Sequence, residues 1–159
     1  MKIKTDTLQE VEIRPLDVKH LPDVLKIENK VFSVPWSINL FYEELFSERR
    51  IYLAALISNV LVGYCGMSYF EPEGHLNTLA VAPNLQGTGI GKKLLCELIN
   101  KAKVVDIKEI WLEVRSKNKK AINLYTSLGF MPVSIRKHYY DKPIEDALIM
   151  CLEIKKNDH

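Results

Sequence analysis

The sequence predicts a mixed α/β fold in which strands and helices are interleaved along one domain, residues 1–159. Three observations lead to this prediction. Short segments with alternating apolar and polar residues indicate half-buried strands. Longer segments with apolar residues three and four positions apart indicate amphipathic helices. A glycine-rich segment lies between one of the strands and one of the helices, and the chain is long enough to bury a hydrophobic core.

The N-terminal part is predicted to contain one strand and two helices. Residues 11–14 alternate as a strand does, and Asp17 precedes a helical segment. Residues 33–37 interrupt the helical pattern, and Ser37 is a suitable N-cap for a second helix because its hydroxyl can accept a hydrogen bond from a free amide. The apolar residues of the two predicted helices are Leu21, Val24, Leu25 and Ile27, then Leu40, Phe41, Leu45 and Phe46.

Three strands are predicted in the middle of the chain, at residues 51–57, 60–70 and 75–81. Ser58 and Asn59 form the turn between the first two strands, and residues 72–74 form the next turn. Pro83 has no amide hydrogen for a sheet and ends the third strand. Because short turns join these strands, we expect them to pair as antiparallel hairpins.

The C-terminal half is predicted to contain two strand–helix units and a last strand. The helix after the glycines carries an apolar stripe from Ile90 to Ala102, and residues 109–115 alternate as a strand. Asn118 begins a short helix, and Gly129 followed by Pro132 marks its C-terminal end. A loop that contains residues 139–141 leads to the last strand, at residues 144–154.

The composition excludes several classes of protein. A net charge of +2 does not give the basic surface of a nucleic-acid-binding protein, and no segment has the ~18 consecutive apolar residues of a membrane span. The cysteines Cys65, Cys96 and Cys151 are three in number and far apart, which indicates reduced thiols rather than disulfides or a zinc site. Residues 1–6 lack the apolar segment of a secretory signal. We therefore expect a cytoplasmic protein with no metal, no nucleic-acid partner and no membrane partner.

The most informative segment is residues 86–92, Gln-Gly-Thr-Gly-Ile-Gly-Lys. A strand, a glycine-rich turn and a helix in this order direct free backbone amides and the positive end of a helix dipole at a phosphate. A Walker A loop would need a glycine where the chain has Gln86 and a hydroxyl where it has Lys93. A dinucleotide fingerprint would need a glycine where the chain has Lys92. The spacing favours another phosphate-binding loop, and a glycine-rich turn without a ligand is the alternative.

The three glycines after Val81 resemble the acetyl-CoA pyrophosphate loop of the GCN5-related N-acetyltransferase (GNAT) superfamily. Residues 112–115, Asn118 and residues 121–130 are similar to a second motif of that superfamily. The segment with Arg136, Tyr139 and Tyr140, together with residues 145–150, is similar to its RimI-like branch, the ribosomal-protein-alanine N-acetyltransferases. The resemblance covers residues 11–154 and implies the GNAT acyl-CoA N-acyltransferase fold, in which helices flank a mixed, mostly antiparallel central sheet.

The resemblance implies acetyl-CoA as the acetyl donor and no metal. In the family, the backbone of the strand before the loop pairs with the pantetheine arm, and a bulge there polarises the thioester carbonyl. The loop supplies amides to the pyrophosphate, and the asparagine both contacts CoA and caps its helix. The residues implied to bind acetyl-CoA are Leu79, Ala80, Val81, Gly87, Thr88, Gly89, Ile90, Gly91, Lys92 and Asn118.

Transfer of an acetyl group to an amine needs a base for the ammonium proton and an acid for the leaving thiolate. Glu113 matches the family's base, and we expect partial burial to raise its pKa. Tyr125 matches the family's acid, because a phenol with a pKa of about 10 stays protonated at neutral pH. From the residues alone, Glu113 can instead pair with Arg115, and Tyr125 can be a core residue. No cysteine has a histidine at the spacing of a nucleophile, so we expect direct transfer in a ternary complex.

Four residues are candidates for the walls of the acceptor site: Pro35, Trp36, Tyr139 and Tyr140. From the residues alone, Trp36 can equally anchor the second helix in the core. The resemblance implies that the acceptor is the N-terminal amine of a protein, the N-terminal alanine of a ribosomal protein, and we expect a monomer or a weak homodimer. Two alternatives stay open. One is a GNAT enzyme that acts on a lysine side chain, a polyamine or another small amine, and the other is a non-catalytic acyl-CoA-binding module.

Overall fold

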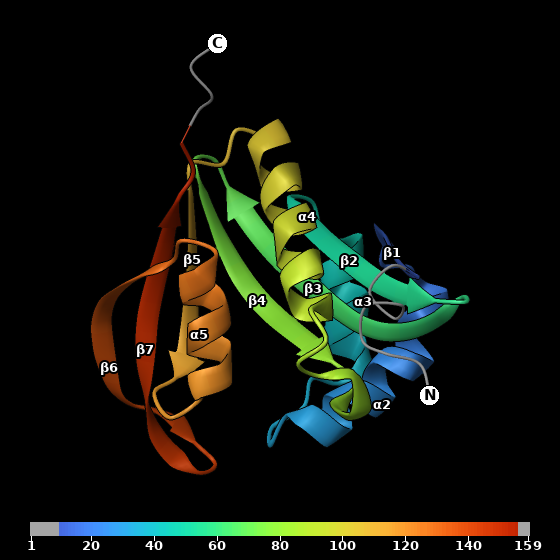
Figure 1. Ribbon diagram of the computed structural model, residues 1–159, viewed down its shortest axis with the longest axis horizontal. Coiled ribbons are helices and arrows are strands. Elements are labelled where there is room, and N and C mark those ends of the chain that lie inside the picture. Colours follow the sequence, from blue (N-terminus) through green and yellow to red (C-terminus); the bar gives the residue numbers. More distant parts are fainter. Residues whose placement is uncertain (1–9, 156–159) are drawn as a thin grey trace.

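The computed structural model describes residues 10–155 and contains one seven-stranded sheet of order β1-β2-β3-β4-β5-β7-β6 (Figure 1). β4 and β5 pair in parallel, and every other neighbouring pair is antiparallel. The predicted mixed, mostly antiparallel sheet is therefore confirmed. The strands are β1 (Val11–Pro15), β2 (Arg50–Ile57), β3 (Val60–Phe70), β4 (Glu73–Val81), β5 (Glu109–Arg115), β6 (Met131–Asp141) and β7 (Ile144–Glu153).

Helices cover both faces of the sheet (Figure 1). On one face, Leu21 and Phe41 of the first two helices are buried against Tyr64 of β3. On the other face, Leu94 and Tyr125 of the last two helices belong to a second apolar cluster. None of the helices in the described part of the chain is long and apolar enough to cross a membrane. The helices are α2 (Leu21–Val31), α3 (Ile38–Phe46), α4 (Ile90–Val104) and α5 (Lys119–Ser127), with short 3-10 turns at Val18–His20 and Pro83–Leu85.

The central feature of the sheet is the limited pairing of β4 with β5. Only Glu73, Gly74 and His75 of β4 pair with β5, opposite residues 109–111. Figure 1 shows the two strands diverging beyond that point. The C-terminal part of β4 therefore has a strand neighbour on the β3 side and none on the β5 side among the described residues. Its backbone groups on that side pair with no other strand of the described chain and can bind an extended ligand.

The predicted helix caps are confirmed. The Ser37 hydroxyl accepts a hydrogen bond from the Leu40 amide at 3.2 Å, and the Asn118 side chain accepts one from the Ala121 amide at 3.2 Å. Gly129 follows α5 with a φ of 101°, a conformation that glycine adopts without steric cost. Local sequence therefore fixes where α3 and α5 begin and where α5 ends.

Three predictions about the elements were wrong. The segment around residues 139–141 is the end of β6 rather than a loop, and Glu73 and Gly74 belong to β4 rather than to a turn. β6 is an edge strand that is exposed almost throughout, and its register with β7 shifts twice, so it shows no regular alternation of burial. Phe46, predicted on the apolar face of α3, is 74% exposed and stacks on Tyr42.

Candidate active site

A cavity of about 1530 Å³ lies where β4 and β5 diverge. Its walls come from α2 and the segment after it, the end of β4, the glycine loop, β5, α5 and the end of β6. The fold thus brings together segments that are far apart in the sequence. The predicted site residues that line the cavity are Trp36, Leu79, Ala80, Val81, Gly87, Gly89, Gly91, Lys92, Glu113, Asn118, Tyr125, Tyr139 and Tyr140.

Three predicted site residues do not line the cavity. The Thr88 hydroxyl donates to the Leu85 carbonyl at 2.6 Å and so holds the loop together. Ile90, the first residue of α4, is buried in the core, and Pro35 is exposed. The side chains of these residues shape the segments that carry the cavity residues, rather than its walls.

The glycine loop leads into the N-terminus of α4, a helix of 15 residues. Gly87 and Gly89 have φ values of 79° and 97°, a backbone conformation that residues other than glycine rarely adopt. A Cβ at Gly87 would meet no atom within 4 Å, so open space lies beside the loop backbone. The Gln86 side chain donates to the Val81 carbonyl at 3.2 Å and ties the loop to the end of β4. Free amides at a helix N-terminus beside an open space are suited to a pyrophosphate.

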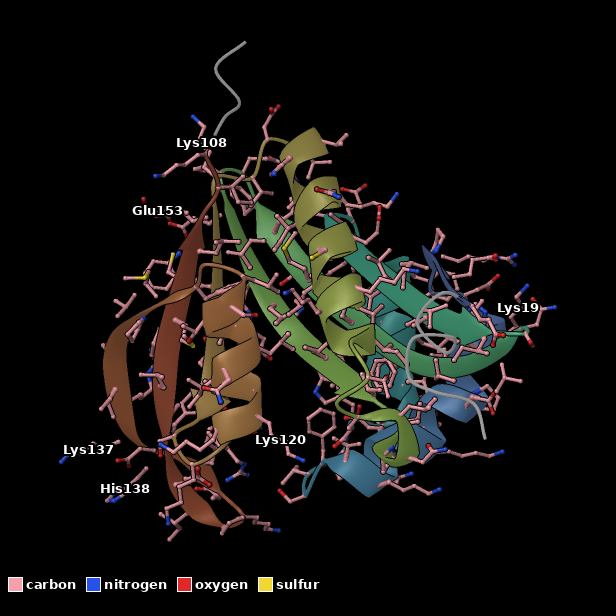
Figure 2. All side chains as sticks on the ribbon, viewed as in Figure 1. Lys19, Lys108, Lys120, Lys137, His138 and Glu153 are labelled. Carbon is pink, nitrogen blue, oxygen red and sulfur yellow. The ribbon has the colours of Figure 1, made fainter. Side chains whose placement is uncertain are left out.

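Two lysines add positive charge to the same end of the cavity. Lys92 lies in the first turn of α4, as the sequence suggested. Lys120 lies in the first turn of α5, also lines the cavity and is labelled in Figure 2; sequence reasoning had not selected it. An exposed lysine near a phosphate contributes a screened attraction, so we expect the amides to provide most of the binding.

The bulge in β4 lies at Asn77. The register with β3 shifts between Gly66 and Met67, which face Thr78 and Leu76, so Asn77 has no residue opposite it. The sequence reasoning had placed a bulge at residues 79–81, which instead pair regularly with β3. A bulge re-aims the neighbouring backbone and side chains, and here it directs Asn77 toward His75 and Glu44.

Glu113 projects from β5 and is partly buried, with 20% of its side chain exposed. Its two carboxylate oxygens lie 2.9 and 2.8 Å from Nε2 of His75. The hydrogen bond with His75 lowers the pKa of Glu113, and burial opposes this shift without overcoming it. The expectation that burial would raise this pKa was therefore wrong, because a histidine partner stabilises the ionised carboxylate. The alternative partner Arg115 pairs with Glu145.

Tyr125 on α5 is almost fully buried beside Phe130, with ring centroids 5.7 Å apart. Burial raises the pKa of its phenol, so the hydroxyl stays protonated well above neutral pH. Within residues 10–155 no hydrogen bond occupies this hydroxyl, and Tyr125 lines the cavity. Tyr125 is thus both a core residue and a hydrogen-bond donor with its hydroxyl available to a ligand.

Glu28 on α2 is a cavity residue that the sequence reasoning missed. Its side chain is almost completely buried, accepts a hydrogen bond from the Trp36 amide at 2.9 Å and contacts the Tyr64 hydroxyl. Burial raises its pKa. Trp36 also packs on Phe41, at 5.1 Å between ring centroids, so it both anchors α3 and lines the cavity.

Arg115 joins two segments at one end of the cavity. Its guanidinium donates to the Ser33 hydroxyl at 3.3 Å and to the Lys142 and Pro143 carbonyls at 3.1 and 3.0 Å. The Ser33 hydroxyl itself donates to the Lys142 carbonyl at 2.6 Å. These contacts connect the segment after α2 with the turn between β6 and β7, so the chain bridges this end of the cavity.

Tyr139 and Tyr140 lie at the end of β6, after the irregular register that includes His138 with a φ of 53°. Their rings meet edge to face, with centroids 5.0 Å apart. The Arg115 guanidinium lies 4.2 Å from the centre of the Tyr140 ring. Both tyrosines line the cavity, and they are held there by contacts with neighbouring arginines.

Sequence reasoning also missed the role of His75. His75 was not among the predicted site residues, and its contact with Glu113 joins residues 38 positions apart. Within residues 10–155 no group of histidine, cysteine and acidic side chains is arranged to hold a metal. One signal for this role was present in the sequence. His75 and Asn77 are polar residues two positions apart on a predicted strand, and strand geometry puts such residues on the same face.

Comparisons with known proteins agree with this geometry. Residues 21–130 match the acetyltransferase (GNAT) family. The chain is 35% identical over 141 residues to the ribosomal protein bS18-alanine N-acetyltransferase of Salmonella typhimurium, covering 87% of this chain and 95% of the relative. The crystal structure of the Escherichia coli ribosomal-protein-S18-alanine N-acetyltransferase superposes with a TM-score of 0.85 at 32% identity, covering 94% and 97% of the two chains. The structure of the NatC complex bound to Gag peptide and CoA gives a TM-score of 0.81 at 27% identity, covering 92% and 99%.

Proposed function

Because this chain belongs to the acetyltransferase (GNAT) family and uses acetyl-CoA as its acetyl donor, we propose that it acetylates the N-terminal amine of a protein. The first candidate acceptor is the N-terminal alanine of ribosomal protein bS18, the substrate named for its relatives. One observation carries this proposal. A single cavity is lined by the glycine loop, by a carboxylate at Glu113 and by a protonated phenol at Tyr125.

The donor end of the cavity is formed by backbone. The amides of the glycine loop and of the first turn of α4 would hold the pyrophosphate, with Lys92 and Lys120 beside them. The free side of β4 at residues 79–81 would pair with the pantetheine arm. Acetyl-CoA supplies the activated acetyl group. These backbone groups orient it without contributing an acid or a base.

Glu113 and Tyr125 are proposed as the acid–base pair. Glu113 is an ionised carboxylate at neutral pH and accepts a proton from the incoming ammonium. Tyr125 keeps its proton until a thiolate develops, since burial raises its pKa, and then donates that proton. The two groups come from β5 and α5, which are joined by a connection of three residues, so their relative placement is set by local structure.

The acceptor end favours a chain terminus. Trp36, Tyr139 and Tyr140 line it, and the contacts between Ser33, Lys142 and Arg115 bridge its two sides. A bridged entrance supports an acceptor that enters end-on, as an N-terminal residue does. The relatives named as bS18-alanine N-acetyltransferases support the same class of acceptor, and the NatC structure bound to a peptide and CoA supports a peptide as acceptor.

The test is the product formed from a panel of amines. The full chain is incubated with acetyl-CoA and a peptide that begins with alanine, the same peptide with a blocked N-terminus and an internal lysine, and a polyamine. We expect mass spectrometry to locate one acetyl group on the alanine nitrogen and none on the blocked peptide or the polyamine. Acetylation of the internal lysine or the polyamine alone would contradict the proposed acceptor. CoA binding without any thiol release would indicate a non-catalytic module.

A further inference from the structure

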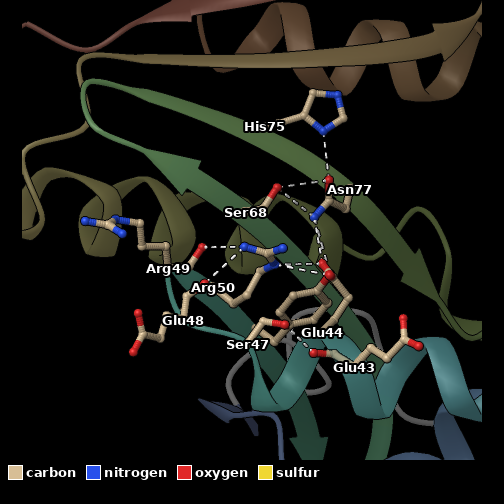
Figure 3. A network of polar contacts seen from close by, with 10 residues as sticks. Glu43, Glu44, Ser47, Glu48, Arg49, Arg50, Ser68, His75 and Asn77 are labelled. Atoms are coloured by element: carbon tan, nitrogen blue, oxygen red, sulfur yellow. Dashed lines mark hydrogen bonds and ion pairs between the residues drawn. The ribbon is translucent and has the colours of Figure 1, made fainter.

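A chain of hydrogen-bonded side chains reaches Glu113 from the opposite part of the sheet. Glu44 of α3 receives two hydrogen bonds of 3.1 Å from Nε of Arg50 and one of 3.2 Å from Nδ2 of Asn77. The other side of Asn77 faces Nδ1 of His75 at 2.8 Å. Figure 3 shows the hydrogen bonds that link Arg50, Glu44, Asn77 and His75 in this order. Nε2 of His75 continues the chain to Glu113.

This chain fixes which atom of His75 carries a hydrogen. The Glu44 carboxylate can only accept, so the Asn77 group that faces it must be the amide NH₂. The Asn77 oxygen then faces Nδ1 of His75, and an oxygen acceptor at 2.8 Å requires a hydrogen on that nitrogen. His75 is therefore a donor at Nδ1 in every protonation state.

The second ring nitrogen faces an acceptor as well. Nε2 of His75 lies 2.8 and 2.9 Å from the two Glu113 oxygens. With its hydrogen on Nδ1, a neutral imidazole would direct a lone pair at a carboxylate. A proton between Nε2 and Glu113 removes this repulsion and makes a charge-assisted hydrogen bond. The pair is thus built to hold one additional proton.

The surroundings keep that proton on the imidazole. Arg136 and Tyr139 of β6 both favour the ionised form of Glu113, as does His75 itself. The bond with Glu113 raises the pKa of His75, burial opposes this, and Asn77 adds to it. The strand neighbours of His75, Ser68 on β3 and Trp111 on β5, carry no charge. Two charged residues, Glu44 and Arg50, lie on the far side of Asn77 from His75. Their charges are of opposite sign, and they form an ion pair with each other.

We propose that Glu113 and His75 act as one proton acceptor, in which the proton removed from the acceptor amine at Glu113 is held on Nε2 of His75. The inference rests on the proposed role of Glu113 as the base. His75 does not line the cavity, so it is a positioning residue that acts through Glu113. The step starts from the form of the pair in which Nε2 carries no hydrogen. The N–H bond of the ammonium breaks, its electron pair stays on the amine nitrogen, and the proton passes through a Glu113 oxygen to form an Nε2–H bond. The neutral amine then attacks the thioester, and the proton later leaves to solvent.

The chemistry explains why a carboxylate alone serves poorly. An α-ammonium has a pKa of about 8 and a free glutamate one of about 4.3, so the transfer to an isolated carboxylate is uphill. Here the pKa of Glu113 is lower still. The imidazole, whose pKa is raised from 6.5, is a much closer match to the amine.

The test compares the pH profiles of kcat/KM for the full chain and two variants, with acetyl-CoA and one alanine-starting peptide. His75→Gln keeps a hydrogen-bond donor for Glu113 and cannot hold the proton. We expect its kcat to fall at least about 10-fold, less than the roughly 100-fold or more for loss of a direct acid or base, because His75 acts through Glu113. We expect the wild type to show an acidic limb above pH 6.5, and we expect this limb to move toward the range of a carboxylate in His75→Gln. His20→Gln, a histidine outside the cavity, is the matched control and should leave both unchanged.

A second measurement is independent of turnover. In protein with ¹⁵N-labelled histidine, NMR should show both His75 nitrogens protonated to higher pH than those of His20. In Glu113→Gln the Nε2 proton should be lost at lower pH. An unprotonated Nε2 in the wild type throughout, or a wild-type pH profile in His75→Gln, would overturn the proposal. If the wild type acetylates another amine instead of the peptide, the acceptor assignment fails, and that amine serves in the same pH profile.

Discussion

Glu28 and Glu113 line the same cavity, from α2 and from β5, and their surroundings shift their pKa values in opposite directions. Glu28 is almost fully buried between neutral donors, the Trp36 amide and the Tyr64 hydroxyl, and burial raises its pKa. Glu113 is more accessible and has a basic partner, His75, which lowers its pKa. The residue type is the same, so the partner decides the direction in which the pKa of the carboxylate shifts.

The largest expected effect separates the two carboxylates by activity. Glu113→Gln should lower kcat about 100-fold or more, because it removes the acceptor of the ammonium proton. Glu28→Gln should change kcat by about 3-fold or less, since the glutamine oxygen can still accept from the Trp36 N–H and its NH₂ can donate to the Tyr64 hydroxyl, which in the wild type donates to Glu28. Steady-state kinetics with an alanine-starting peptide tests both. Equal losses in the two variants would remove the distinction.

Tyr125→Phe tests whether the reactive side of the cavity needs a second group. Removal of the hydroxyl should lower kcat about 100-fold, because the leaving thiolate loses its proton donor. Phenylalanine fills the same space beside Phe130, so the thermal midpoint should change little. A variant with normal kcat would show that solvent protonates the thiolate and would leave Glu113 as the sole reactive side chain.

Glu28→Ala tests the structural side of the comparison. The Trp36 amide and the Tyr64 hydroxyl would lose their acceptor inside the protein, at a cost of about 2 kcal/mol in the free energy of unfolding. Urea unfolding measures the loss, and Glu28→Gln is the matched control with little change. A fully stable alanine variant would mean that water replaces the carboxylate.

Gly91→Ala extends the comparison to the donor end, which is built from backbone. The added methyl would lie 3.4 Å from Leu124 and 3.8 Å from Val81, ordinary contacts, so stability should be kept. Both neighbours line the cavity, so the methyl narrows it where acetyl-CoA would lie. The KM for acetyl-CoA should rise about 10-fold, equivalent to roughly 1.4 kcal/mol, with kcat preserved. Calorimetry with CoA checks the binding directly, and unaltered affinity would place the donor elsewhere.

The smallest expected effect is on the pH dependence of stability. The raised pKa of His75 stabilises the fold fully below pH 6.5, and this contribution is lost as pH rises through the folded-state value. The lowered pKa of Glu113 stabilises the fold above pH 4.5, and this contribution is lost as pH falls through its folded-state value. The difference in unfolding free energy between the wild type and His75→Gln should therefore be largest between pH 4.5 and 6.5.

Glu28 should behave differently in the same experiment. Its pKa is raised, so its contribution is present below pH 4.5 and is lost as pH rises through the folded-state value. Relative to the wild type, the unfolding free energy of Glu28→Gln should increase as pH rises, and it should show no maximum difference at intermediate pH of the kind expected for His75→Gln. Parallel urea titrations from pH 4 to 9 measure both variants. A difference that does not vary with pH for either variant would contradict the assigned partners.

Local features of the chain were predictable, and features that depend on distant contacts were not. Ser37 and Asn118 cap their helices as predicted, because a cap depends on residues three positions apart. The glycine loop was correctly predicted to lie between a strand and a helix, because this prediction also depends on residues close together in the sequence. β6 was missed because its signal comes from pairing with β7 rather than from a regular apolar pattern. The pKa of Glu113 was predicted in the wrong direction because its partner His75 is 38 positions away.

The sequence by itself determined the order of strands and helices as far as α5, the phosphate-type loop at residues 86–92 and the candidates for the reactive side chains. These depend on residue spacing within one or two turns of chain. The tertiary structure decided that β4 and β5 separate after three paired residues and leave a cavity between them. It also decided that Glu113 meets a histidine while Glu28 meets neutral donors. Hydrogen bonding and burial act through space, so the protonation of a carboxylate follows from the residues that folding brings beside it.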